Sequence, residues 1–203
     1  SSANGAPLRF APGEAFQFDW SVEYAQLGGQ RRRLELAHLK LCASRAFWLV
    51  AYPQQSHEML FDAHTRAFLA FGGVPRRGIY DNMKTAVDKV GAGKERAVNA
   101  RFLALCSHYL FDPDFCNRAA GWEKGVVEKN VQDRRRQLWQ TVVAQEWPSL
   151  AALNEHLATA CRAAWTTLRH PEDPEQTVAE RFLAEQPQLL PMPRAFDGYI
   201  EQP

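Results

Sequence analysis

The chain has 203 residues, of which 46% are hydrophobic and 23% charged, and its formal net charge is +1 at pH 7. This length suffices for one substantial core with a small appendage, and the balanced charge excludes a strong overall field toward nucleic acid or anionic membranes. Affinity for DNA must therefore come from local clusters such as Arg31 to Arg33, Arg76-Arg77 and Arg134 to Arg136. Each cluster also fits a solvated charge run.

The cysteines indicate a reduced protein. Cys42, Cys106, Cys116 and Cys161 are far apart and form no Cys-x-x-Cys pair, so we expect neither a structural zinc site nor a disulfide scaffold. The sequence also contains no signal peptide and no apolar run of membrane-spanning length, and we expect a cytoplasmic protein. It begins without a methionine, so we expect a piece of a longer protein, with residues 1–14 as a lead or linker.

The first half of the chain predicts a three-stranded meander followed by a helix. From Phe16 to Tyr24 aromatic and polar residues alternate, which is typical of a strand with one buried face. After the Gly28-Gly29 turn, the runs 34–41 and 47–52 predict two further strands. Residues 56–71 have helical apolar spacing, with a serine at the start and two glycines at the end that predict its boundaries.

The second half predicts alternating short strands and helices. We expect a strand at 77–80 that delivers Asp81 at its tip, a helix at 99–110, a strand at 109–115 and a mobile loop from Cys116 to Lys124. Helices are expected at 125–139, 149–168 and 178–185. This order fits an α/β domain with a mixed sheet flanked by helices at 15–145, a helical extension at 146–186 and a proline-rich linker at 187–203.

Three acidic residues occupy unusual places in this scheme. Asp19 lies between two aromatic residues in the first strand, where a carboxylate needs a hydrogen-bond network or a cation. Asp81 at a strand tip also fits an ordinary turn, and Glu128 alone fits a solvated helix face. Together they could converge on one edge of the sheet and offer the oxygen ligands that magnesium prefers. Two such ions about 3.5–4 Å apart support in-line displacement at phosphorus.

Four segments resemble IstA-type insertion-sequence transposases, which have a DDE-type catalytic core. They are FQFDW around Asp19, YDNMKTAV around Asp81, KGVVEKNVQ around Glu128, and the later TVAERFLAEQPQLLPMP. The resemblance implies a ribonuclease H-like, retroviral-integrase-like fold in which Asp19, Asp81 and Glu128 are the catalytic metal ligands. It also implies two Mg²⁺ ions, with Mn²⁺ as a substitute, and a reaction that first hydrolyses the element ends and then transfers these strands to target DNA.

The resemblance further implies partners. An IstB-type ATPase helper is expected to supply ATP hydrolysis, since the chain has no GxxxxGK[ST] loop. The active complex is expected to be a homo-oligomer on DNA. Departures from the family pattern are Val126, where a small or basic residue is common, and the short lead before residue 15, so recognition of element ends is expected elsewhere.

The helix expected around Glu128 also predicts DNA contacts. Val127, Val131 and Leu138 form an apolar stripe at helical spacing. Four residues on its flank, Lys124, Gln132, Arg135 and Arg136, share a ridge with Glu128 and suit phosphate contacts. These arginines would equally fit an exposed, solubilised helix or a pair with Asp133.

Two other functions remain open from the residues. A ribonuclease H-like nuclease without joining activity would use the same carboxylates, but the match of several motifs in order favours the transposase. A catalytically silent DNA-binding or assembly module is the other alternative. The retention of all three acidic residues argues against a silent module.

Overall fold

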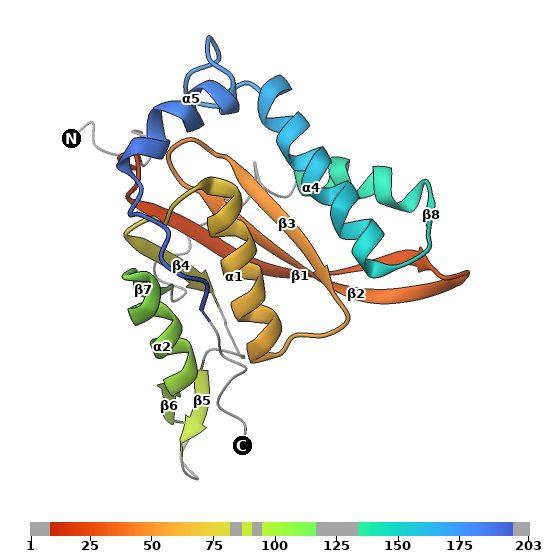
Figure 1. Cartoon of the computed structure of the whole chain (residues 1–203), viewed down its shortest axis with the longest axis horizontal. Helices are drawn as coiled ribbons and strands as arrows, with labels where there is room; N and C mark the ends of the chain where they lie inside the picture. The colour runs from red at the N-terminus through yellow and green to blue at the C-terminus, as the bar shows by residue number, and fades with distance from the viewer. Residues whose placement is uncertain (1–8, 82–86, 91–94, 117–133, 197–203) are drawn as a thin grey trace, which may run out of the picture.

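The structure is a computed structural model, and it describes residues 9–81, 87–90, 95–116 and 134–196. Its centre is a mixed sheet in the order β3-β2-β1-β4-β7 (Figure 1). The bounds are β1 Ala15–Leu27, β2 Gln30–Leu41, β3 Phe47–Tyr52, β4 Arg77–Asp81 and β7 Asp112–Cys116. The first three strands are antiparallel, whereas β4 and β7 run parallel to β1. The predicted mixed sheet flanked by helices is confirmed.

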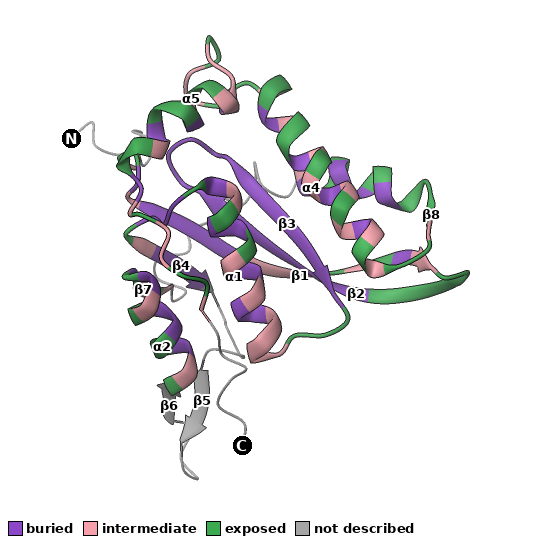
Figure 2. Cartoon of the chain, in the orientation of Figure 1, coloured by how far each residue is buried: buried purple, intermediate pink, exposed green. Residues whose placement is uncertain are grey.

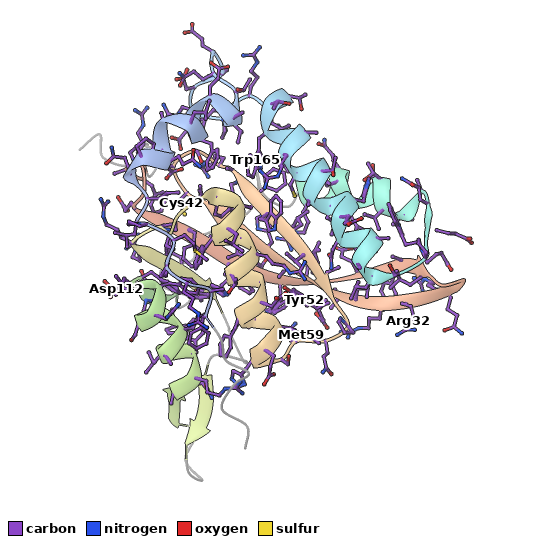
Figure 3. All side chains as sticks on the ribbon, in the orientation of Figure 1. Arg32, Cys42, Tyr52, Met59, Asp112 and Trp165 are labelled. Atoms are coloured by element: carbon purple, nitrogen blue, oxygen red, sulfur yellow. The ribbon has the colours of Figure 1, made fainter. Side chains whose placement is uncertain are left out.

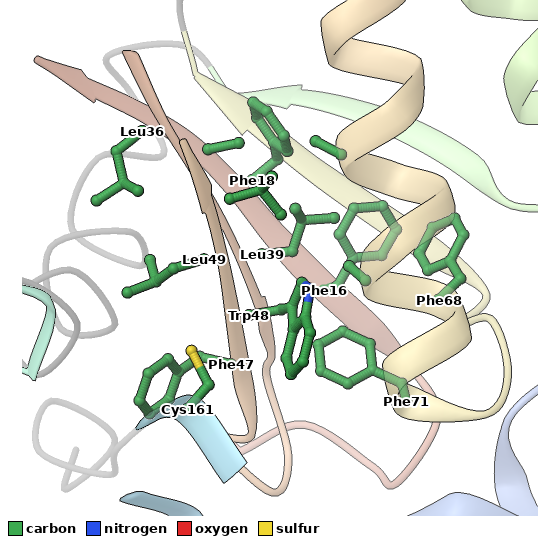
Figure 4. Packing of buried hydrophobic residues seen from close by; sticks show 14 of the residues in the cluster. Phe16, Phe18, Leu36, Leu39, Phe47, Trp48, Leu49, Phe68, Phe71 and Cys161 are labelled. Carbon is green, nitrogen blue, oxygen red and sulfur yellow. The ribbon is translucent and has the colours of Figure 1, made fainter. Parts of the chain in front are cut away.

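Helices cover both faces of the sheet. α1 (His57–Phe71) and α2 (Ala100–Tyr109) lie on the face that carries Phe16 and Phe18. The opposite face is covered by a helix at residues 134–143 and by α4 (Leu150–Thr167). Figure 4 shows Phe16, Phe18 and Trp48 directed toward α1, with Leu49 and Cys161 on the other side. Figure 2 shows that burial runs through the central strands and ends where the β1–β2 ribbon projects outward.

The register of β1 decides which side chains face which helices. Phe16 and Phe18 are fully buried and make edge or stacked contacts with Phe68 and His64 of α1. Because side chains alternate along a strand, Asp19 lies on the opposite face, beneath the helix at 134–143. The sheet therefore directs its aromatic residues to one side and its first acidic residue to the other.

Local capping explains where the helices begin and end. Ser56 accepts a hydrogen bond from the Met59 amide at the start of α1, and Gly72 ends that helix with φ 74°. Asn99 caps α2 through the amides of Arg101 and Phe102, and Ser149 caps α4. These ends agree with the boundaries predicted from sequence to within one or two residues.

The C-terminal part packs on the core as far as Phe196. α5 (Val178–Glu185) continues into a 3₁₀ turn, η3 (Gln186–Gln188), and Leu190 then bridges Val74 in an antiparallel pair. The Phe196 ring meets Phe61 of α1 edge-on, and its amide donates to the Tyr109 hydroxyl at 3.0 Å. Residues 187–196, which the sequence predicts as linker, therefore contact the domain.

Several elements differ from the sequence prediction. The hairpin β5 (Val87–Val90) and β6 (Glu95–Val98) was not predicted, nor was β8 (Glu146–Trp147), which pairs with the far end of β1. The described helix at 134–143 extends beyond the predicted end at residue 139. The predicted loop lies, after Cys116, outside the described residues. Cys42, Cys106 and Cys161 are buried free thiols, as expected. Among the described residues, no helix is long and apolar enough to cross a membrane.

Candidate active site

The strand register brings the first two predicted site residues together. Phe18 of β1 pairs with Tyr80 of the parallel strand β4, so the next residue on each strand is Asp19 and Asp81. Neighbouring strands lie about 4.8 Å apart, which makes these two positions adjacent in the sheet. Asp81 also pairs with Cys116 at the end of β7. Only the backbone of Asp81 is described, so its side chain adds nothing to this geometry.

Asp19 is held by an ion pair with Arg135. An Oδ2 of Asp19 accepts from Nη2 of Arg135 at 3.0 Å, and the two side chains are 30% and 7% exposed. The Nε of Arg135 is buried with no hydrogen-bond partner among the described residues. The carboxylate thus faces a nearly buried guanidinium on one side and remains open to solvent on another.

The other predicted residues fall into two groups. Glu128, Lys124 and Gln132 lie outside the described residues. Arg136 is exposed, as a DNA contact requires, whereas Arg135 is 6% exposed. Arg135 shares the buried side of its helix with Leu138, Trp139 and Val142. Arg135 was expected on an open ridge. In the structure its side chain is buried against the sheet, where it forms the ion pair with Asp19.

A groove of about 730 Å³ opens between the outer part of β1 and the helix at 134–143, and Arg135, the ion-pair partner of Asp19, forms part of its wall. Ser21 and Glu23, which follow Asp19 on the same strand face, line it together with Arg135, Arg136 and Trp139. The pKa of Glu23 is raised above its ordinary value, because the effect of burial outweighs the opposing effects of Arg135, Ser21 and Arg136. Glu23 was not among the predicted site residues, although it alternates with Asp19 along the strand sequence.

A buried polar pair lies across the strand from Asp19. His38 is the direct partner of Asp19 in the β1–β2 register, and Lys40 is the partner of Gln17. Burial, followed by the charges of Arg135 and Lys40, holds the pKa of His38 well below its usual range, so its imidazole is neutral at pH 7. Sequence analysis missed both residues. The signal was a His and a Lys at alternate positions of the mostly apolar strand sequence LELAHLKL.

The donor set suits a hard divalent cation. Carboxylates at two adjacent strand positions offer the oxygen ligands that Mg²⁺ accepts, while neutral His38 is buried and offers no exposed soft ligand. In the described part of the chain, no three His, Cys, Asp or Glu side chains form a group that could hold a metal. Two of the three expected ligands, the Asp81 side chain and Glu128, lie outside that part.

A family model matches the part of the chain that carries the first two predicted site residues. The model described as "Integrase core domain" matches residues 11–120, more than half of the chain. The matched stretch runs from before β1 through β7 and includes Asp19 and Asp81.

Bacterial transposases match nearly the whole chain. The "Transposase for insertion sequences IS1326/IS1353" of Pseudomonas aeruginosa is 61% identical over 97% of this chain, which spans 38% of that protein. A transposase of Aminobacter aminovorans is 56% identical over 96% of the chain and 38% of its own length. The transposase for element IS21 of Pseudomonas aeruginosa is 32% identical over 90% of the chain and 46% of its own length. The chain thus covers less than half of each relative.

Solved retroviral structures share the fold. The HTLV-2 integrase catalytic core domain in complex with magnesium superposes with a TM-score of 0.62 at 13% identity, covering 87% of this chain and 99% of that one. An intasome of simian T-cell lymphotropic virus, in complex with a PP2A regulatory subunit, gives a TM-score of 0.66 at 14% identity, covering 98% and 64%. The expected integrase-like fold is therefore confirmed. The two helices predicted after it are present as α4 and α5.

Proposed function

The chain belongs to the integrase core domain family, and from this membership we propose that it is the catalytic core of an insertion-sequence transposase of the DDE type. In this proposal the core hydrolyses the ends of its element and then transfers the resulting 3′-hydroxyl strands to target DNA. Similarity to IS21-type transposases over 90% or more of the chain supports the choice of insertion sequences as substrates.

The observation that carries the proposal is the pairing of Asp19 and Asp81. Their strands run parallel and reach the same level of the sheet, so the two positions are neighbours although 62 residues separate them in sequence. A strand-centre aspartate is unfavourable for packing, and here its carboxylate reaches the solvent-accessible face beside the groove. This placement suits ligation better than a purely structural role.

We propose Asp19, Asp81 and Glu128 as the ligands of two Mg²⁺ ions, which Mn²⁺ could replace. When bound, such ions activate the attacking oxygen and stabilise the leaving oxygen. Asp19 contributes an oxygen that Arg135 neutralises in the present structure. Arg135 would therefore have to release this oxygen, and a DNA phosphate is the natural alternative partner for its guanidinium.

DNA contacts and partners complete the proposal. Arg136 is exposed at the groove beside Asp19 and could neutralise one backbone phosphate. Lys124 and Gln132 are proposed to extend this contact. An IstB-type ATPase helper and a homo-oligomeric active complex are also proposed, on the resemblance of the motifs to IstA-type transposases.

Substitution of the three acidic residues tests the proposal. Asp19→Asn, Asp81→Asn and Glu128→Gln, made in the full-length enzyme, are each expected to abolish end cleavage and strand transfer with Mg²⁺. Glu155→Gln, an exposed carboxylate on α4, is the matched control and should retain activity. A labelled element-end duplex and a target plasmid report cleavage and joining separately. Near wild-type activity in any of the three variants would remove that residue from the site.

The same assay separates the alternatives. Cleaved ends without joined product under conditions that support binding would identify a nuclease. DNA binding without either product in the unsubstituted enzyme would identify an assembly module.

A further inference from the structure

A second cavity lies on the same sheet face as Asp19, between the β2–β3 turn and the segment after α4. Its cationic or titratable lining residues are His38, Lys40, Arg45, Arg134 and Arg169. The remaining lining residues are apolar, and no carboxylate is among the lining side chains that the structure describes. Four basic side chains therefore converge on one small cavity, and burial, followed by the charge of Arg45, holds the pKa of Lys40 well below its usual range when no anion is bound.

Two of the basic side chains that line the cavity are almost completely buried. Lys40 is 4% exposed and Arg45 is 5% exposed. Arg45 donates through Nη2 to Glu172 at 2.9 Å, but its Nε and Nη1 are buried with no partner in the described part of the chain. Burial of a charge is strongly unfavourable unless an opposite charge and hydrogen bonds compensate. Glu172 pairs with Nη2 alone, so an anion in the cavity would find unpaired donors on Arg45 and would favour the charged form of Lys40.

The backbone holds Arg45 in an unusual conformation. Its φ of 73° lies in the left-handed region, which costs a non-glycine residue about 1 kcal/mol or more. Neighbouring contacts fix the turn: the Arg45 amide donates to Leu41 at 3.0 Å and the Ser44 amide to Glu185 at 3.1 Å. His170 contacts the Ala43 carbonyl at 2.7 Å from the opposite wall. Such strain is common where a side chain must be held for a ligand.

The cavity has the size and chemistry for one oxyanion. Its volume of about 90 Å³ exceeds the ~30 Å³ that a single water occupies in the liquid. A lysine ammonium and the unpaired Nε and Nη1 of Arg45 can donate to several oxygens of a tetrahedral group, which offers more acceptors than the two oxygens of a carboxylate. We propose that Lys40 and Arg45 form a binding site for a phosphate group, with Arg134 and Arg169 at its entrance.

The position of the site indicates the source of that phosphate. Lys40 lies two residues along β2 from His38, the cross-strand partner of Asp19, so cavity and candidate active site share one surface. Arg134 and Arg135, which are adjacent in the helix at 134–143, contact the cavity and Asp19 respectively. We therefore assign the phosphate to the backbone of a bound DNA strand. This assignment rests on the proposed function. Free phosphate has the same chemistry and is distinguished below.

The test uses the full-length protein with Lys40→Met, which keeps the length of the side chain and removes the charge. Arg169→Gln, at the exposed entrance, is a second variant that does not disturb the core. Arg66→Met is the matched control, because Arg66 is an exposed cation on α1 across the sheet. Inorganic phosphate is the first probe, compared with chloride at equal ionic strength. A DNA duplex titrated at several salt concentrations is the second.

For the wild type and the control, about 10 mM phosphate should raise Tm by about 2–4 °C. Lys40→Met should lose this shift, and Arg169→Gln should reduce it. If the phosphate belongs to DNA, Lys40→Met or Arg169→Gln also lowers the slope of log K against log salt by about 1. Loss of the Tm shift with an unchanged slope assigns the site to free phosphate. An unchanged shift and slope in both variants overturns the proposal. None of these readouts requires cleavage, so the proposed reaction can fail independently.

Discussion

Asp19 and Arg135 depend on one another for stability whatever reaction the site performs. The Arg135 side chain is 7% exposed, and Asp19 is the only carboxylate that contacts it in the described residues. Asp19→Asn should lower the free energy of unfolding by about 1–3 kcal/mol without divalent ions, because a buried cation loses its counterion. The lower end is favoured because Asp19 itself is 30% exposed. Urea unfolding at pH 7 measures the loss.

The double variant with Arg135→Met is the control for this pair. It removes both charges and should recover most of the lost stability. If the two single losses simply add, the ion pair contributes no coupling, and the reason given for the inward position of Arg135 is wrong.

His64 should make the fold sensitive to mild acid. Its Nδ1 must donate to the Leu60 carbonyl at 2.7 Å, so Nε2 accepts from the Tyr80 hydroxyl at 2.7 Å in the neutral ring. Burial lowers the pKa of His64 to about 4, against 6.5 in the unfolded chain. The unfolded state therefore binds more protons between these values. Stability is complete above pH 6.5 and falls by up to about 3 kcal/mol as the pH decreases to 4.

Urea unfolding at pH 7, 5.5 and 4.5 tests this dependence. His64→Phe combined with Tyr80→Phe leaves no unpaired hydroxyl and should flatten the curve in this range. Some slope should remain, because burial also lowers the pKa of His38 and His170. An identical slope in wild type and double variant would exclude His64 as its source.

A single carboxylate on α5 accepts hydrogen bonds from two loops that are distant in sequence. Glu185 is 1% exposed and accepts from the amides of Gly13 at 2.7 Å and Ser44 at 3.1 Å. Glu185→Ala should destabilise the protein by about 2–4 kcal/mol, because it leaves two buried amides without acceptors. Hydrogen exchange should accelerate at both amides. Glu180→Ala, which removes half of the exposed capping box of α5, is the control and should cost about 1 kcal/mol or less. If both variants lost the same free energy of unfolding, the hydrogen bonds from Gly13 and Ser44 to Glu185 would contribute nothing to stability.

The elements that sequence predicted well carry their own boundary signals. α1 begins at a serine cap and ends at a glycine with positive φ, and β1 alternates without interruption. The hairpin β5–β6 was missed because its strands have four residues each and little apolar alternation. β8 has two residues and exists only because it meets the end of β1. Such contacts depend on tertiary structure, which local patterns do not encode.

The same distinction holds for the candidate site. Asp19 was predictable because a carboxylate between aromatic residues conflicts with its strand. The inward turn of Arg135 was not, since a helical period gives a residue's angle but not its distant ion-pair partner. The cavity at Lys40 and Arg45 forms only when the segment after α4 lies over the β2–β3 turn. Their local sequence has no motif that predicts this contact.

At the scale of the molecule, the sheet and the C-terminal helices form one core. Buried residues of β1 to β3, α1, α4 and α5 belong to a single cluster. α4 alone buries Leu153, Leu157, Cys161 and Trp165, and the Trp165 indole donates to the Phe47 carbonyl at 3.0 Å. Trp165 is labelled in Figure 3. Asn154 adds two hydrogen bonds to the Ala51 backbone, at 2.7 and 3.0 Å. The predicted division between residues 145 and 146 therefore does not separate two hydrophobic cores, because residues on both sides of it pack in one cluster.

A chain that ends at Gln145 should consequently fail to fold cooperatively. Each large apolar side chain buried by α4 contributes about 1.5–3 kcal/mol, so the loss from this helix is comparable to the roughly 5–15 kcal/mol that stabilises a whole domain. The truncation also exposes Phe47 and Leu49 on β3 and should promote aggregation. Urea unfolding followed by tryptophan fluorescence and circular dichroism tests this expectation, with a chain ending at Phe196 as the control. The control should give one coincident transition by both probes. A sharp transition of the shorter chain at the control's midpoint would instead establish residues 15–145 as an independent domain.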